Sequence, residues 1–203
     1  MLALALFLAS CATAPETTVP VPEPVPTETR LPPLTSRDHG RILAAFGGEY
    51  SAPTVERLAS EILERLAAAS DKPDQRYRLT ILNSPSINAF ALPSGHLYIT
   101  RGMLALINDV SEFAAVLGHE IAHVSARHAS QREDQVRTSE LVAVMRARLL
   151  NDMAGAEARR EAARVSLASF SRTQEVEADV IGVALVAKAG YDPYGASRFL
   201  QTM

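Results

Sequence analysis

The sequence predicts an α+β domain that is mostly helical and carries a small β-sheet. Apolar residues at helical spacing run from Pro53 to Ala69 and through most of the chain beyond Ser111. Three short strand-like segments lie together between Tyr77 and Thr100. Of the 203 residues, 47% are hydrophobic, so the chain is long enough for one domain of about 160 residues with a substantial core.

The N-terminal residues resemble an export signal. The apolar run within residues 1–14 is too short to span a bilayer, so residues 1–10 are interpreted as a signal peptide. The stretch Leu8-Ala9-Ser10-Cys11 resembles a bacterial lipobox, and we expect cleavage before Cys11 and lipid on its sulfur. An ordinary signal peptide followed by a free thiol is the alternative. No Lys or Arg precedes the apolar run, which departs from the usual pattern.

A proline-rich segment follows over residues 11–36 and predicts a tether. Residues 12–36 hold seven of the twelve prolines, interleaved with Thr, Val and Glu. Such a composition favours extended polyproline II and cannot form a core. Ala12, not Asp, follows the cysteine. We therefore expect a lipoprotein on the periplasmic face of the outer membrane, with its folded domain over residues 37–203.

The first half of this domain is expected to hold two helices and three strands. Their predicted ranges are helices 37–46 and 53–69 and strands 77–83, 87–92 and 96–100. Pro93 indicates that the second strand lies at an edge or a bend of the sheet.

The second half is expected to be helical. Ser111 is a candidate N-cap for a helix that runs through Val124, and Asp109 adds a favourable charge near its start. Val180, Ile181, Val183, Ala184 and Val186 are expected to pack in the core. Gly190 is expected to end that helix. The predicted ranges are a short helix 101–108, helices 131–150, 156–170 and 174–189, a loop 151–155, and a last helix from residue 191.

The most informative stretch is His119-Glu120-Ile121-Ala122-His123, which reads H-E-x-x-H. Helix residues four apart share a face, so His119 and His123 can direct their imidazoles at one point, where zinc is the usual ion. Glu120 lies about 100° round the helix from His119. It is poorly placed as a ligand but can contact a water on the open side of a metal, which is the general-base position of a zinc peptidase.

A third ligand is available about fifty residues downstream. Glu175 and Asp179 share a face of a predicted helix, so Glu175 can complete a His₂Glu site. Asp179 can then accept the free N–H of a ligand histidine, which fixes its tautomer. The alternative is a solvated helix start rich in acidic residues. Beside an H-E-x-x-H we favour the metal interpretation, with one Zn²⁺ per chain.

Other histidines are less suitable as ligands. A metzincin would carry Gly and His where this chain has Ala126 and Ala129, which excludes that branch. His128 is about 140° away from the face of His123, so we interpret it as a surface residue or as one that contacts a ligand from outside. His96 is interpreted as an ordinary strand residue.

Several motifs together resemble one family. The runs Asn88-Ala89-Phe90 to Pro93 and Gly95, His119 to His128, Glu175 to Asp179, and Ala189-Gly190-Tyr191-Asp192-Pro193 are similar to those of HtpX-like and CAAX-prenyl-protease-like zinc metallopeptidases. The resemblance covers about residues 37–203 in the family's order. It is strongest to the soluble periplasmic members linked to outer-membrane assembly quality control, and it implies a zincin-like domain with the sheet beside the active-site helix.

The resemblance implies a zinc metalloendopeptidase. It assigns the metal ligands to His119, His123 and Glu175, the general base to Glu120, and the supporting acid to Asp179. Unfolded or misassembled cell-envelope polypeptides would be the substrates, bound along Asn88, Ala89 and Phe90 as an added strand. The outer-membrane assembly machinery is an expected partner, and the lipid on Cys11 would attach the protein to the membrane.

The sequence leaves open one alternative function and the identity of the residue that would stabilise an oxyanion. An envelope chaperone or adaptor could bind outer-membrane clients by the same strand edge, with a closed or non-catalytic metal site. Nucleic acid is not an expected partner, because the net charge is −3 and no basic stripe is present. Tyr191, His128 and Arg172 are only candidates for stabilising an oxyanion. Since such proteases usually continue beyond the last helix, the chain is expected to be a fragment or a minimal member.

Overall fold

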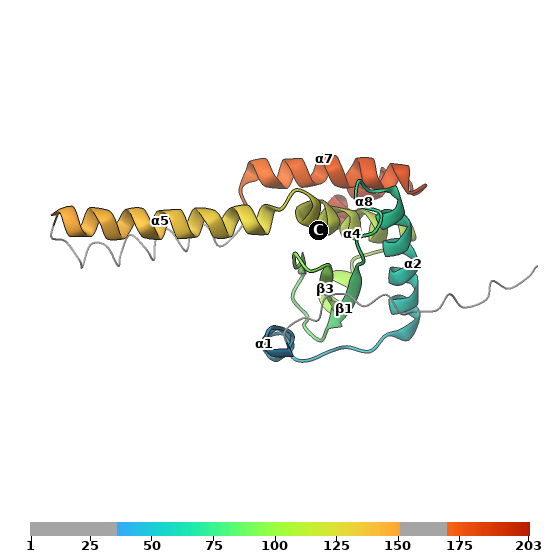
Figure 1. Cartoon of the computed structure of the whole chain (residues 1–203). Helices are drawn as coiled ribbons and strands as arrows, with labels where there is room; N and C mark the ends of the chain where they lie inside the picture. The colour runs from blue at the N-terminus through green and yellow to red at the C-terminus, as the bar shows by residue number, and fades with distance from the viewer. Residues whose placement is uncertain (1–35, 151–169) are drawn as a thin grey trace, which may run out of the picture.

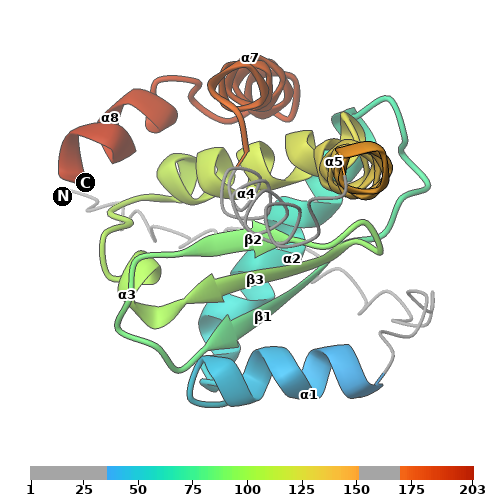
Figure 2. The same cartoon turned by 90° about the vertical axis from the view of Figure 1, so that its left-hand side faces the viewer.

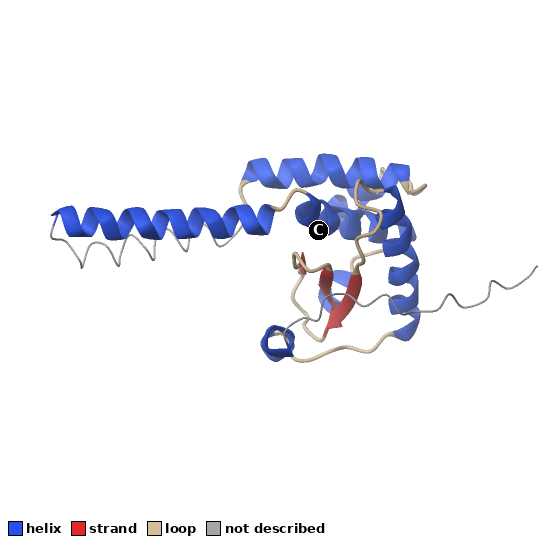
Figure 3. Ribbon diagram, in the orientation of Figure 1, coloured by secondary structure: helices blue, strands red, loops and turns tan. Residues whose placement is uncertain are grey.

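The computed structural model describes residues 36–150 and 170–203, which form a small sheet enclosed by helices (Figure 1). In chain order the elements are α1 (Ser36–Ala45), α2 (Pro53–Ala69), β1 (Arg78–Leu82), β2 (Ala89–Ala91), β3 (His96–Thr100), α3 (Arg101–Leu104), α4 (Val110–Ser125), α5 (His128–Leu150), α7 (Arg172–Lys188) and α8 (Gly195–Thr202). Figure 3 shows the strands confined to the centre of the molecule, so the predicted α+β class is confirmed.

The sheet has the strand order β1-β3-β2, with β1 parallel and β2 antiparallel to β3. The predicted edge position of the second strand is therefore correct. In Figure 2, α2 lies behind the sheet, α4 lies beyond β2, and α7 lies on the far side of α4. The core forms where α2, the sheet and α4 meet, and its fully buried residues include Ile62, Leu66, Ile81, Leu97, Ile99, Leu117 and Ile121.

The other face of the sheet packs against α1 through aromatic rings. Phe90 stacks on Tyr98 with ring centroids 5.0 Å apart, and Phe46 lies 5.7 Å from Phe90. His39 of α1 is hydrogen-bonded to the Tyr98 hydroxyl at 3.0 Å. These contacts leave Phe90 as a packing residue on the side of the sheet that faces α1.

The start of α4 corrects one prediction. Asp109, not Ser111, is the N-cap, because its Oδ1 accepts a hydrogen bond from the Glu112 N–H at 2.8 Å. Ser111 instead accepts a hydrogen bond from the Asp192 N–H at 3.2 Å, before α8. Arg198 of α8 also pairs with Asp109 at 2.9 Å. The last helix is thereby attached to the first turn of α4.

Helix α7 corrects a second prediction. Of the face that was expected to be buried, Val180 and Val183 are exposed, at 66% and 37%. Val186 is buried as predicted, and the rest of the buried stripe consists of Ala178, Gly182 and Leu185. Small residues are buried here because α7 packs closely against α4. The helix ends at Lys188, and Gly190, the predicted helix stop, lies just beyond it in the left-handed conformation with a φ of 84°.

Smaller differences concern lengths. The second strand and the helix after the third strand are shorter than expected, while α5 begins at His128 and projects away from the rest of the described chain (Figure 1). The predicted signal peptide and tether lie outside the described residues. So do the predicted loop 151–155 and helix 156–170, except for Phe170, which precedes α7 without helical structure. None of the described helices is both long and apolar enough to cross a bilayer.

Candidate metal centre

The two histidines of the H-E-x-x-H stretch converge on one face of α4. His119 Nε2 and His123 Nε2 are 3.0 Å apart. The His123 side chain is only 6% exposed and that of His119 is 28% exposed. Burial, followed by the nearby His119, His128 and Arg132, lowers the pKa of His123 to about 4. The ring is therefore neutral at pH 7, which is the form that binds a metal.

Glu175, in the first turn of α7, completes a group of three. Its Oε2 lies 3.4 Å from His119 Nε2 and 3.8 Å from His123 Nε2. A tetrahedral zinc ion with bonds of about 2.0–2.1 Å requires ligand atoms separated by about 3.3 Å. The three separations lie around that value, so the donor set fits zinc. Within the part of the chain that the structure describes, this is the group of His, Cys and carboxylate side chains able to hold a metal ion.

A contact between two glycines brings α7 close enough for this arrangement. A Cβ atom added to Gly182 would lie 3.1 Å from the N and Cα atoms of His119. A Cβ atom added to Gly118 would lie 2.9 Å from Cγ2 of Val186. Both distances are shorter than ordinary van der Waals contact. The missing side chains therefore let the backbones of the two helices touch beside His119.

The outer nitrogen of His119 is held by an exposed carboxylate. His119 Nδ1 lies 2.9 Å from Asp179 Oδ1, and the Asp179 side chain is 59% exposed. The proton on Nδ1 therefore points at Asp179 and leaves the lone pair of Nε2 directed at the candidate metal position. This is the contact that the spacing of Glu175 and Asp179 predicts.

The outer nitrogen of His123 is held by a buried histidine. His123 Nδ1 lies 3.0 Å from Nδ1 of His128, which is 0% exposed. Because His123 directs Nε2 at the site, its Nδ1 donates and His128 Nδ1 accepts. His128 then carries its own proton on Nε2, which lies 3.4 Å from Glu177 Oε2. His128 therefore contacts the ligand histidine His123, which is one of its two predicted positions, and the other prediction, a position on the surface, is wrong.

Sequence reasoning missed two residues around His123. Glu177 was not singled out, because two residues from Glu175 along a helix it lies on a different face. Phe170 stacks on the His123 ring with centroids 4.1 Å apart, and Arg132 lies 4.7 Å from the centre of the Phe170 ring. Phe170 follows the residues outside the described ranges, and no local pattern signals its position.

Glu120 points from α4 toward the sheet edge. Its carboxylate accepts a hydrogen bond from the backbone of Ala91 in β2. Burial and, to a smaller extent, the Glu175 carboxylate raise the pKa of Glu120 to about 8, against the opposing effect of the Ala91 contact. A carboxyl group with a pKa near neutral pH is suited to take up and release a proton.

The three predicted substrate-binding residues, Ala89 and Phe90 in β2 and Asn88 just before it, differ in which way their backbone groups point. Thr100 N donates to Asn88 O and Leu92 N to His96 O, so these residues face β3. In an antiparallel pair the orientation alternates, which leaves the backbone groups of Ala89 and Ala91 facing outward. Of Asn88, Ala89 and Phe90, Ala89 is therefore the one with backbone groups free toward a further strand.

The three residues considered for stabilising an oxyanion do not meet beside the candidate metal position. Tyr191 packs against Arg65 of α2, beyond the other end of α7 from Glu175, roughly 20 Å along that helix. Arg172 is exposed at the first residue of α7. His128 lies behind His123, on the side away from the converging nitrogen atoms.

Comparison with known proteins agrees with this site. Residues 53–203 match peptidase family M48. The mitochondrial metalloendopeptidase OMA1 of Schizosaccharomyces pombe is 33% identical over 144 residues, covering 71% of this chain and 42% of that protein. The beta-barrel assembly-enhancing protease of Yersinia pestis is 31% identical over 160 residues, or 74% of this chain and 33% of that protein. The protein of that name from Escherichia coli is 29% identical over the same shares.

The relatives extend well beyond the region compared, since the chain spans between a third and about two fifths of their length. The matched region nevertheless includes α2, the sheet and every residue of the candidate metal centre. The motifs identified in the sequence, their arrangement in the fold and the family match agree, and the chain belongs to peptidase family M48.

Proposed function

We propose that the chain is a zinc-dependent endopeptidase that hydrolyses internal peptide bonds of unfolded or misassembled cell-envelope proteins. The observation that carries the proposal is the convergence of His119 Nε2, His123 Nε2 and Glu175 Oε2 beside Glu120, with the outward edge of β2 next to them. A structural zinc site usually has four protein ligands and needs no base. Three ligands beside a half-buried carboxyl group are the arrangement of a catalytic site.

The roles of the side chains follow from their positions. His119, His123 and Glu175 would hold the zinc ion, which when bound acidifies a water and polarises a carbonyl group. Glu120 takes a proton from the attacking water and passes it to the leaving amine. Asp179 and His128 fix the tautomers of the two histidines. No serine or cysteine nucleophile is required.

The outward edge of β2 supports an extended polypeptide as substrate. A chain that pairs with Ala89 and with the carbonyl of Ala91, whose N–H already contacts Glu120, would bind through main-chain hydrogen bonds, which do not depend on its side chains. Its next peptide group would then lie beside Glu120, which contacts Ala91. Binding of this kind suits unfolded proteins, whose backbones are accessible.

The cellular setting is also part of the proposal. We propose that Cys11 carries lipid, that residues 11–36 form a tether, and that the enzyme acts at the periplasmic face of the outer membrane, near its assembly machinery. The name of the two beta-barrel assembly-enhancing relatives supports this setting.

The test compares the full chain with its Glu120→Gln variant at equal bound zinc, with casein as an unfolded substrate. Cleavage by the first and a loss of at least about 10³-fold in the second are expected, because the proton transfer is removed while the ligands remain. Equal cleavage by both would identify a contaminant and refute the mechanism. Zinc binding without cleavage by either would favour the chaperone or adaptor.

A further inference from the structure

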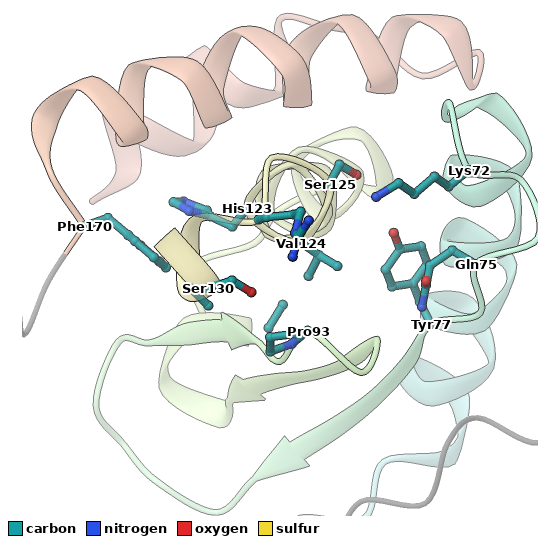
Figure 4. A pocket seen from close by; sticks show the side chains of 12 residues that line it. Lys72, Gln75, Tyr77, Pro93, His123, Val124, Ser125, Ser130 and Phe170 are labelled. Carbon is teal, nitrogen blue, oxygen red and sulfur yellow. The ribbon is translucent and has the colours of Figure 1, made fainter. Parts of the chain in front are cut away.

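A cavity of about 330 Å³ opens beside the candidate metal centre (Figure 4). It lies between the C-terminal end of α4, the loop before β1 and the residues that follow β2. The candidate ligand His123 lines the cavity, and so does Ala91, whose backbone contacts Glu120. His119, Glu120 and Glu175 do not line it. The cavity is therefore on one side of the reacting position, next to the path of a chain paired with β2.

The cavity is positively charged. Lys72 and Arg127 line it, and no Asp or Glu is among the described residues that line it. Within residues 36–150 and 170–203, neither of these two side chains has an ion pair or a hydrogen bond. Two unpaired cations at one concave site attract an anion.

Hydroxyl groups add hydrogen-bond donors to these charges. The Tyr77 hydroxyl is buried and lies beside the Ser125 side chain, and among the described residues it has no partner at hydrogen-bonding geometry. Burial raises the pKa of Tyr77, so its hydroxyl keeps its proton and can donate. Figure 4 shows the Lys72 nitrogen and the Ser125 and Tyr77 oxygens pointing toward one another. A buried donor without a partner is costly unless a ligand supplies the acceptor.

The backbone at Arg127 is unusual in the same place. Its φ of 59° makes it the non-glycine residue with a left-handed conformation within the described residues. Side chains other than Asn and Asp rarely adopt this region. The conformation turns the chain between α4 and α5 and places the arginine at the rim of the cavity. Strained residues of this kind cluster at binding sites.

We propose that this cavity binds a carboxylate group of the polypeptide substrate, so that an acidic residue is preferred on one side of the cleaved bond. The inference rests on the proposed function and names a substrate feature for it. A strand advances about 3.3 Å per residue and alternates its side chains, so a side chain one to three residues from the cleaved bond can reach the cavity from β2. The carboxylate can come from Asp or Glu, or from the end of a chain.

The experiment uses the zinc-loaded full chain and matched ten-residue peptides with blocked ends. Glu or Gln occupies each of the three positions on either side of the cleaved bond in turn. A further Gln peptide has a free C-terminus, to distinguish the two sources of the carboxylate. The ratio of kcat/KM for Glu over Gln is measured in the wild type, in Lys72→Gln/Arg127→Asn, and in the control Lys188→Gln. Asn is chosen at 127 because it tolerates a positive φ.

The wild type is expected to prefer Glu by about tenfold at positions on one side only, and the preference should weaken as salt is added. It should fall to about one in the double variant and persist in Lys188→Gln. A ratio near one in the wild type, or an unchanged ratio in the double variant, overturns the inference. If no peptide is cleaved, the proposed function fails, and the dissociation constants of the same peptides decide the cavity's preference by the same criteria.

Discussion

The two histidines of the metal centre lie one turn apart on α4, but their surroundings differ. Asp179 supports His119 through one contact at the surface, and its side chain is 59% exposed. His123 is supported by His128, which is 0% exposed and in turn contacts Glu177, and Phe170 covers its ring. Asp179 therefore only orients its ligand histidine, whereas His128 both orients a ligand histidine and forms part of the protein's interior.

The largest effect should follow from breaking the buried support. His128→Ala removes a fully buried ring and leaves the His123 Nδ1–H without an acceptor, so we expect a loss of about 2–4 kcal/mol in the free energy of unfolding. Zinc affinity should fall about 10- to 100-fold. Urea unfolding of the metal-free chain and competition with a zinc chelator measure the two quantities.

A second variant separates packing from orientation at this position. In His128→Asn the side-chain oxygen lies near the place of Nδ1 and can accept from His123. Zinc affinity should therefore recover at least partly, while the stability lost through the smaller volume should not. Equal zinc affinities of His128→Ala and His128→Asn would show that the hydrogen bond to His123 does not orient the ligand.

Removing the exposed support, Asp179, should have a smaller effect that is confined to zinc affinity. Asp179→Ala is expected to weaken zinc binding about tenfold, because the His119 ring loses the partner that fixes its tautomer. The free energy of unfolding of the metal-free chain should change by less than about 0.5 kcal/mol, since the side chain is exposed. Asp134→Ala, which removes an exposed carboxylate from α5, is the control. A loss of stability as large as that of His128→Ala would remove the distinction between the two supports.

The smallest effect concerns the pH dependence of the metal-free chain, through the carboxyl group next to the histidines. The pKa of Glu120 is about 8 in the folded chain, against an ordinary value of 4.5. Between these values Glu120 binds more protons in the folded state than in the unfolded state, which lowers stability as pH rises. His123, whose pKa is lowered from 6.5 to about 4, acts in the opposite direction below about pH 6.5, so the decrease should be seen from about pH 6.5 to 8. We expect a decrease of roughly 1 kcal/mol, because Glu120 keeps partial contact with solvent. Thermal unfolding of the chelated wild type should show the decrease, and Glu120→Gln should show a flatter profile.

The sequence predicted those parts of the site that depend on spacing along one helix. His119 with His123, and Glu175 with Asp179, are each four residues apart, and each pair shares a face as helix geometry requires. The burial of His128 and the roles of Glu177 and Phe170 depend on how α4, α5 and α7 meet, which no local pattern encodes. The metal ligation itself remains a prediction that the zinc measurements test.

The fold shows the same limit. Ser111 and Asp109 are both good N-cap residues, and only the position of Asp192 beside Ser111 shows why Asp109 caps the helix. In α7 the apolar residues occur all round the helix, so the sequence could not show which stripe is buried. The buried stripe contains Gly182 because packing against α4 requires a residue without a side chain.

The glycine contact between α4 and α7 also determines how the centre responds to motion. Side chains of long residues change rotamer readily, but two touching backbones cannot approach further and separate only when whole helices move. The spacing between Glu175 and the two histidines is therefore set mainly by a rigid-body coordinate. The three donor atoms should consequently move together. The distances from the Glu175 oxygen to the two histidine nitrogens should vary less than a flexible glutamate side chain alone would permit.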